Sequence, residues 1–130
     1  MKIERFIDIE DEIRRILAPY MTAYVRPLPK DFIVPSILIT WVGGTENEKI
    51  DTFDVTIDSR AEDEDTAQLN LRNAIGVIEA VTKTQTTALR YVTINTLGSW
   101  GHDPVRQDLA MCTARLRVTA HKEITEITEV

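Results

Sequence analysis

Ser99, His102 and Asp103 are the residue types of a hydrolytic catalytic triad, and they lie close together in the sequence. In a triad the histidine is a general base that activates the serine, and the aspartate orients the imidazole. Adjacent side chains of an extended chain point in opposite directions, however, and no serine of this chain lies in a Gly-x-Ser-x-Gly motif. Because Gly101-His102-Asp103-Pro104 has the composition of a turn, we predict a structural role and no catalytic site.

Acidic side chains are concentrated at Glu62-Asp63-Glu64-Asp65, which suggests a cation site at first sight. The run lacks the alternating carboxylates and the glycine of an EF-hand loop. It precedes a stretch of helical periodicity, and negative charges stabilise a helix N-terminus. The two histidines, His102 and His121, are distant in the sequence and have no clustered ligands beside them. We therefore predict no metal and no other cofactor.

Composition and charge argue against several classes of protein. The chain of 130 residues has a net charge of -6, whereas affinity for nucleic acid comes largely from Lys and Arg. The single cysteine, Cys112, excludes an intrachain disulfide, and its apolar neighbours predict an inert buried thiol. No apolar run approaches the roughly 20 residues of a membrane span. The N-terminal residues lack the features of a signal peptide, so we expect a cytoplasmic product.

The stretch 53–83 is the one around which the other elements must be arranged. Its first residues alternate between apolar and polar types, with Phe53, Val55 and Ile57 on one face, which predicts a half-buried strand over 50–59. The period then changes to that of a helix over 62–82. The apolar positions of this helix form one stripe: Ala67, Leu71, Ala74, Ile75, Ile78, Val81 and Thr82. A helix of this length is marginal alone, so it must pack on a sheet.

Further elements follow from the same patterns. We predict a helix over 6–18 with Asp8 as its N-cap, a short strand over 22–26, and a strand over 36–42 that is covered on both faces. We predict a hairpin with a protruding loop over 43–52, a strand over 90–97, and an irregular segment over 98–108. The last strand covers 109–121, where small and apolar residues alternate with polar ones.

These elements predict an α+β fold: one mixed or antiparallel sheet of four to five strands with two helices on one face. We expect a single domain over 1–121, followed by a mobile C-terminal arm over 122–130. Trp41 lies in an apolar strand and is expected in the core. Trp100 lies between glycines and is either a lid on the sheet or an anchor at an interface. Arg115 and Arg117 share a strand face, which is either solvated or paired with acids of a neighbouring copy.

The order of these segments resembles the tail-terminator, or tail-completion, proteins at the head-to-tail junction of long-tailed bacteriophages. Four segments carry the resemblance: the Pro-rich link YVRPLPKDFIVPSILI after the first helix, the strand and helix DVTIDSRAEDEDTAQLNLRNAIGVIEAV, the segment GSWGHDPVRQDLA, and the alternating strand MCTARLRVTAHK. The likeness extends over nearly the whole chain and lies in the order and texture of the segments.

The resemblance implies a structural virion protein that forms a ring, usually a hexamer, and needs no cofactor. Such a protein is assembled in the host cytoplasm, caps the tail tube and joins it to the head connector proteins, and DNA passes through it without sequence-specific binding. The segments 43–52, 98–108 and 122–130 would then touch the tube and the connector. The residues expected at subunit or partner interfaces are Thr45, Glu48, Trp100, His102, Asp103, Arg106, Arg115 and Arg117.

Three other functions remain open at this point. The chain could be a head-completion adaptor or stopper of the same junction. It could be a stand-alone α+β ligand-binding module, which predicts a concave apolar pocket. It could also be a small enzyme that uses His102 and Asp103, although the residues of a complete catalytic site are not evident.

Overall fold

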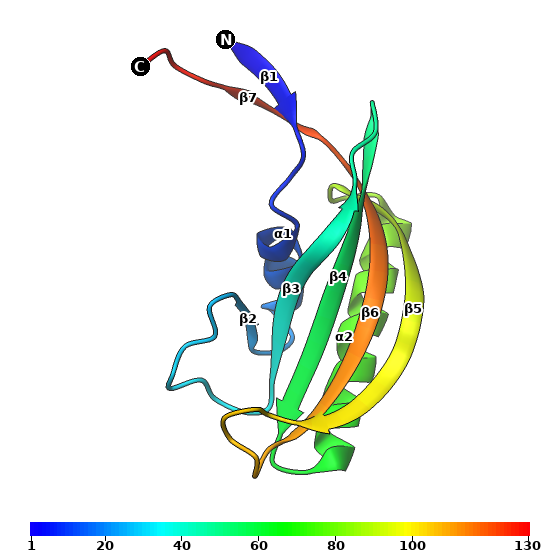
Figure 1. Ribbon diagram of the computed structural model, residues 1–130. Coiled ribbons are helices and arrows are strands. Elements are labelled where there is room, and N and C mark those ends of the chain that lie inside the picture. Colours follow the sequence, from blue (N-terminus) through cyan, green and yellow to red (C-terminus); the bar gives the residue numbers. More distant parts are fainter.

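The computed structural model describes residues 1–130 and contains two helices and seven strands (Figure 1). The elements are β1 (Lys2–Arg5), α1 (Ile9–Leu17), β2 (Ala23–Val25), β3 (Ser36–Thr45), β4 (Ile50–Ala61), α2 (Glu64–Thr84), β5 (Leu89–His102), β6 (Ala110–His121) and β7 (Glu123–Glu126). Five strands form one sheet in the order β2-β3-β4-β6-β5, and β1 and β7 form a separate two-stranded sheet. The prediction of an α+β fold with one sheet of four to five strands is confirmed.

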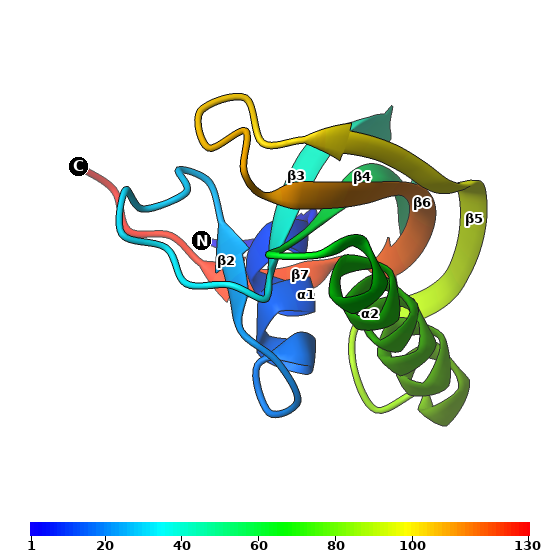
Figure 2. The same cartoon turned by 90° about the horizontal axis from the view of Figure 1, so that it is seen from below.

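The main sheet is mixed, because β2 runs parallel to β3 while the other neighbours are antiparallel. Both helices lie on the same side of the curved sheet, which Figure 2 shows along the strands. One hydrophobic core lies between the two layers, and apolar side chains of α1, α2, β3, β4 and β6 belong to it. The opposite face of the sheet carries no helix, and from here on it is called the open face.

The alternating patterns of β4 and β6 explain this arrangement. Phe53, Val55 and Ile57 of β4 are buried, as are the alternate residues of β6 from Ala110 to Ala120. The stripe of α2 is buried against them at Ala67, Leu71, Ala74, Ile75, Ile78 and Thr82. Each fully buried Ile, Leu or Val contributes about 1.5–3 kcal/mol through removal of its surface from water. This burial selects the register in which every apolar residue faces the helices.

Each helix has an aspartate as its N-cap: Asp8, as predicted, and Asp63, which lies within the acidic run. The Asp8 carboxylate accepts from the N–H of Asp11, and the Asp63 carboxylate accepts from the N–H of Thr66. This hydrogen bond to Thr66 is the main reason why the pKa of Asp63 lies below its ordinary value. The acidic run is therefore a helix start, as predicted. The predicted first helix began too early, because Phe6 precedes Asp8 and packs its ring against those of Trp41 and Phe53.

The sequence-based boundary at residue 98 is wrong, because β5 continues through the Gly-rich segment to His102. Pairing continues from Ser99 opposite Thr113 to His102 opposite Ala110, after register shifts earlier in the strand. Glycines usually indicate a turn in a single sequence, yet a neighbouring strand can hold them extended by backbone hydrogen bonds. The irregular segment is thereby reduced to the connection 103–109.

The hairpin between β3 and β4 is also more regular than predicted, with only residues 46–49 outside the strands. Gly44 allows the close approach of β3 to β4 here, since its φ is +149° and a Cβ there would approach the Thr52 carbonyl oxygen to 2.1 Å. Two expectations for β3 are corrected. The strand is covered on one face only, and Trp41 lies at the edge of the core with 38% of its surface exposed.

The C-terminal segment is not an isolated arm. Residues Glu123–Glu126 pair antiparallel with Lys2–Arg5, so the two ends of the described chain form one ribbon. Figure 1 shows this ribbon standing away from the rest of the domain, beside the hairpin end of the sheet. No sequence periodicity over four residues can indicate such a pairing, because the contact joins residues more than a hundred positions apart. From here on β1 and β7 together are called the terminal ribbon.

Candidate interaction surface

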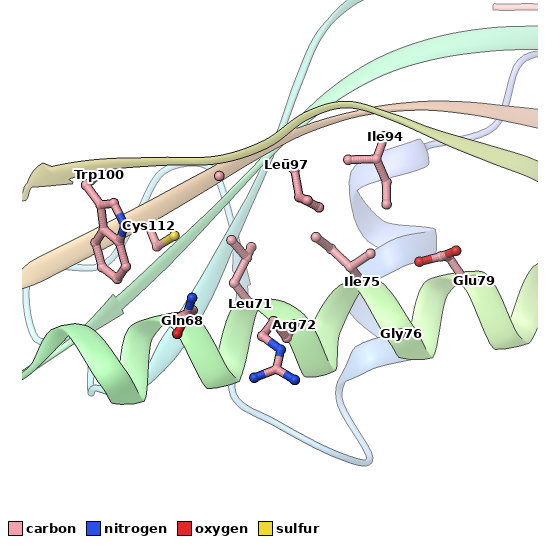
Figure 3. Close-up of a pocket in the computed structure, with 11 residues that line it drawn as sticks. Gln68, Leu71, Arg72, Ile75, Gly76, Glu79, Ile94, Leu97, Trp100 and Cys112 are labelled. Carbon is pink, nitrogen blue, oxygen red and sulfur yellow. The ribbon is translucent and has the colours of Figure 1, made fainter.

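An apolar groove lies between α2 and β5, which is an edge strand of the sheet. Its volume is about 570 Å³, and its apolar lining consists of Leu71, Ile75, Ile94, Leu97, Trp100 and Cys112. In Figure 3 the side chains of β5 hang toward the helix, while those of Leu71 and Ile75 rise toward the strand. Polar side chains of α2, those of Gln68, Arg72 and Glu79, border the groove. The arrangement suits an apolar partner with a polar margin.

Trp100 forms one end of this groove and is half-exposed. Its backbone is held in β5 opposite Cys112, which directs the indole to the helix side of the sheet (Figure 3). Cys112 itself is buried, and this burial raises the pKa of its thiol. The thiol is therefore part of the wall of the groove. A large aromatic side chain that remains half-exposed in an apolar groove is typical of an interface anchor.

Asp103 lies in the interior and not on the surface expected for an interface residue. Its carboxylate is 2.6 Å from the Arg60 Nε atom and also accepts from the N–H groups of Val105 and Arg106. Burial by itself would raise the pKa of Asp103, but these hydrogen bonds and the Arg60 charge hold that pKa below its ordinary value. The carboxylate thereby fixes the connection 103–109 against β4. From here on this pair and its connection are called the Asp103 clamp.

The triad residue types do not form a triad. His102 is exposed at the end of β5, while Asp103 points inward to Arg60. Ser99 lies on β5 opposite Thr113 of β6, and no hydrogen bond joins Ser99 to His102. Arg106 projects from the Asp103 clamp and places its guanidinium 5.8 Å from the centre of the Phe32 ring. Arg106 thus links the connection 103–109 to the connection 26–35 at this end of the sheet.

Arg115 and Arg117 lie on the open face, where both are exposed. Arg117 donates to Asp54 of the neighbouring strand at 3.0 Å, which satisfies its charge within the chain. Arg115 has no acidic partner within hydrogen-bonding distance. The open face therefore presents one paired and one unpaired arginine, and Asp58 on the same face accepts from Thr113.

Thr45 and Glu48 lie at the opposite end of the sheet from the Asp103 clamp. Thr45 ends β3, and Glu48 is exposed in the connection 46–49. The same end contains a network that the sequence-based analysis missed, in which Lys122 donates to Asp51 at 2.8 Å and to Glu46 at 3.2 Å. The hydrogen bond with Asp51 is the main cause of the raised pKa of Lys122. This network anchors the residue that links β6 to the terminal ribbon.

The structure thus distributes the eight expected interface residues over four regions. Trp100 belongs to the groove, His102, Asp103 and Arg106 to the clamp end, Thr45 and Glu48 to the hairpin end, and Arg115 and Arg117 to the open face. One missed residue carried a usable signal. Asp51 lies on the buried face of β4, the face that also carries Phe53, and a buried carboxylate requires a cationic partner.

Comparison with known proteins adds no family assignment. The sequence matches no protein-family model, and it has no significant match among curated proteins. No cluster of three or more His, Cys, Asp or Glu side chains is arranged to hold a metal ion. Neither helix combines the length and apolar character that a membrane crossing requires.

Proposed function

We propose that this chain is a ring-forming structural protein of a long-tailed bacteriophage, which closes the tail tube and joins it to the head connector. The observation that carries the proposal is a sheet whose open face and whose β5 edge are both free of other elements. Free strand edges are usually shortened or covered in monomeric proteins. A long free edge is therefore expected where copies of a protein meet.

The distribution of charge and shape supports the same role. Six copies would carry a formal charge of -36, six times the -6 of one chain, and a channel with an acidic or neutral wall lets DNA pass without binding its phosphates. The two ends of the sheet differ, with the hairpin and terminal ribbon at one end and the Asp103 clamp at the other (Figure 1). A subunit between a tube and a connector needs two unlike ends of this kind.

Electron microscopy of the purified protein in negative stain tests the assembly. We expect closed rings that become more abundant with protein concentration. We also expect that phage particles lacking the protein have tails that are not joined to heads, and that the supplied wild-type protein restores joining. A protein that remains monomeric at all concentrations, together with normal particles in its absence, would remove the proposal.

Two substitutions connect the assembly to named residues. Trp100→Ala shortens the anchor in the groove, and Arg117→Glu places a carboxylate beside Asp54 on the open face. Both side chains are exposed, so we expect unchanged thermal unfolding and fewer completed particles in a complementation assay. Normal tails with both variants would show that neither surface takes part. Accumulation of unfinished heads, with complete free tails, would instead assign the protein to the head side as an adaptor or stopper.

The groove favours one second candidate, a small ligand-binding module. Its volume of about 570 Å³ and its six apolar side chains are in the range of ligand pockets. This candidate predicts that an apolar fluorescent dye binds the monomer with a defined stoichiometry and quenches Trp100. Loss of this binding when rings form would favour the structural role, because the groove would then be covered by another copy.

A further inference from the structure

The edge of β5 is an acceptor for an additional strand. β5 is the last strand in the sheet order, so one row of its N–H and C=O groups has no partner strand. Register shifts with β6 interrupt it three times, but Ser99–His102 form an unbroken stretch of four residues. Trp100 of this stretch and Leu97 just before it are 50% and 74% exposed. Unpaired backbone groups beside apolar pockets are the features by which proteins bind an added β-strand.

The terminal ribbon has the features of the strand that would be added. β7 is four residues long, the same length as the unbroken stretch of β5. Isolated two-stranded ribbons are marginally stable in water, and this one is held by exposed ion pairs between Met1 and Glu126 and between Arg5 and Glu123. Ile124 is 70% exposed on the ribbon. The ribbon therefore gains stability from any partner that covers its apolar side chain and its free edge.

We propose that the terminal ribbon of one copy adds to the β5 edge of a second copy, with β7 paired to Ser99–His102 and Ile124 packed on Trp100 and Leu97. The inference specifies the subunit contact of the ring and rests on the proposed function. The result is a seven-stranded sheet, five strands from one copy and two from the next.

Charge complementarity selects a second copy as the occupant of the groove. Arg72, at the groove, forms no salt bridge within its own chain. Glu126, whose side chain is 63% exposed and pairs within its own chain with the Met1 ammonium, follows Ile124 by two residues and therefore points to the same side of β7. When Ile124 covers the groove, Glu126 is brought to the side on which Arg72 lies. In one orientation of β7, Ile124 therefore matches the apolar lining of the groove and Glu126 matches the charge of Arg72.

The terminal ribbon and the β5 edge lie on opposite sides of one copy, so the contact runs from the ribbon of one copy to the β5 edge of the next. In Figure 1 the terminal ribbon leaves the domain on one side, at the upper left, and β5 forms the opposite margin of the sheet. Each copy therefore has one donor and one acceptor, and the two surfaces are different. Contacts between unlike surfaces build closed rings when the rotation between copies closes, whereas contacts between like surfaces end at a dimer.

Cross-linking between two variants tests the contact directly. His102 lies on the same side of β5 as Trp100, two residues further along. Ile124→Cys protein is mixed with His102→Cys protein and treated with a short bis-maleimide; the buried Cys112 remains unreactive. We expect cross-linked heterodimers in good yield. Tyr20→Cys, exposed in the turn after α1 and part of neither surface, is the matched control for His102→Cys and should yield at least tenfold less product. Equal yields with both partners would overturn the inference.

A second pair of variants separates this inference from the proposed function. Ile124→Glu should abolish rings in light scattering and negative stain, while Ile33→Glu, a similarly exposed isoleucine in the connection 26–35, should leave them intact. Arg72→Glu should weaken ring formation, and adding Glu126→Arg should restore it. Rings that persist in Ile124→Glu would refute the ribbon contact and leave the ring proposal standing. A wild-type protein without rings at any concentration would refute both.

Discussion

The Asp103 clamp and the terminal ribbon lie at opposite ends of the sheet, and both are held by charged side chains, yet they differ in burial. In the clamp, the Arg60 and Asp103 side chains are only 9% and 5% exposed. In the ribbon, the paired side chains of Arg5 and Glu123 are 52% and 41% exposed. A buried pair holds its element because its loss leaves an unpaired charge inside, whereas an exposed pair contributes little. One end is thus fixed by a buried ion pair within the chain, whereas the other is held only by exposed pairs.

The largest effect is expected for the clamp. Asp103→Ala leaves the buried Arg60 guanidinium with only the more distant Asp58 carboxylate at 3.9 Å, and it removes the acceptor for two N–H groups of the connection 103–109. Breaking a buried ion pair costs about 3–5 kcal/mol. We expect the free energy of unfolding in urea to fall by that amount. A change below about 1 kcal/mol would mean that the clamp resembles the ribbon, and the comparison would fail.

A smaller effect is expected from acid, again at the clamp. The pKa of Asp103 is lower in the folded chain than its ordinary value of 3.8, so the unfolded chain binds its proton first as the pH falls. The stabilisation by Asp103 is therefore complete above about pH 4 and is lost as the pH falls through the folded pKa. Urea unfolding at pH values from 6 down to 2 measures this loss. The free energy of unfolding of Asp103→Asn should decline less steeply with falling pH than that of the wild-type protein. Parallel curves would exclude the clamp as the source of the decline.

Alkaline pH should act on the hairpin end, next to the ribbon. The pKa of Lys122 is raised in the folded chain, chiefly by its hydrogen bond with Asp51, so its contribution is present below the ordinary value of 10.5. That contribution disappears as the pH rises through the folded pKa. We therefore expect the thermal stability of the wild-type protein to decline above about pH 10. Lys122→Met should lack this decline. Identical alkaline profiles would show that the network of Asp51 and Glu46 does not depend on this charge.

The smallest effect is expected for the ribbon pairs. Arg5→Ala removes one exposed ion pair with Glu123, and such pairs contribute about 0–1 kcal/mol. We expect the free energy of unfolding of the monomer to change by less than about 0.5 kcal/mol, and the ion pair of the clamp to remain intact. Hydrogen exchange of the β7 amides should be fast in the monomer and at least tenfold slower in any ring. Slow exchange in the monomer would mean that the ribbon is stable without a partner.

Much of the fold was accessible from the sequence, since long periodic segments encode their own environment. The stripe of α2 and the alternation of β6 indicate which side of each element is buried, whatever its partner. The candidate surface was less accessible. Trp100 was predicted to be either a lid on the sheet or an anchor at an interface, but the groove beside it requires α2 and β5 to be placed together. Asp103 was assigned to an interface because the sequence does not indicate that Arg60 lies opposite it.

The sequence by itself determined that this chain folds as one α+β domain, with a strand that passes through an acidic run into a helix and with a single apolar layer beneath both helices. Periodicity and capping are local properties, so a few neighbouring residues suffice to specify them. Only the tertiary structure decided that the Gly-rich segment continues β5, that the chain ends pair as a ribbon, and that Asp103 is internal. Each of these depends on a partner distant in sequence, and the free energy that selects it comes from burial or backbone pairing that no local pattern records.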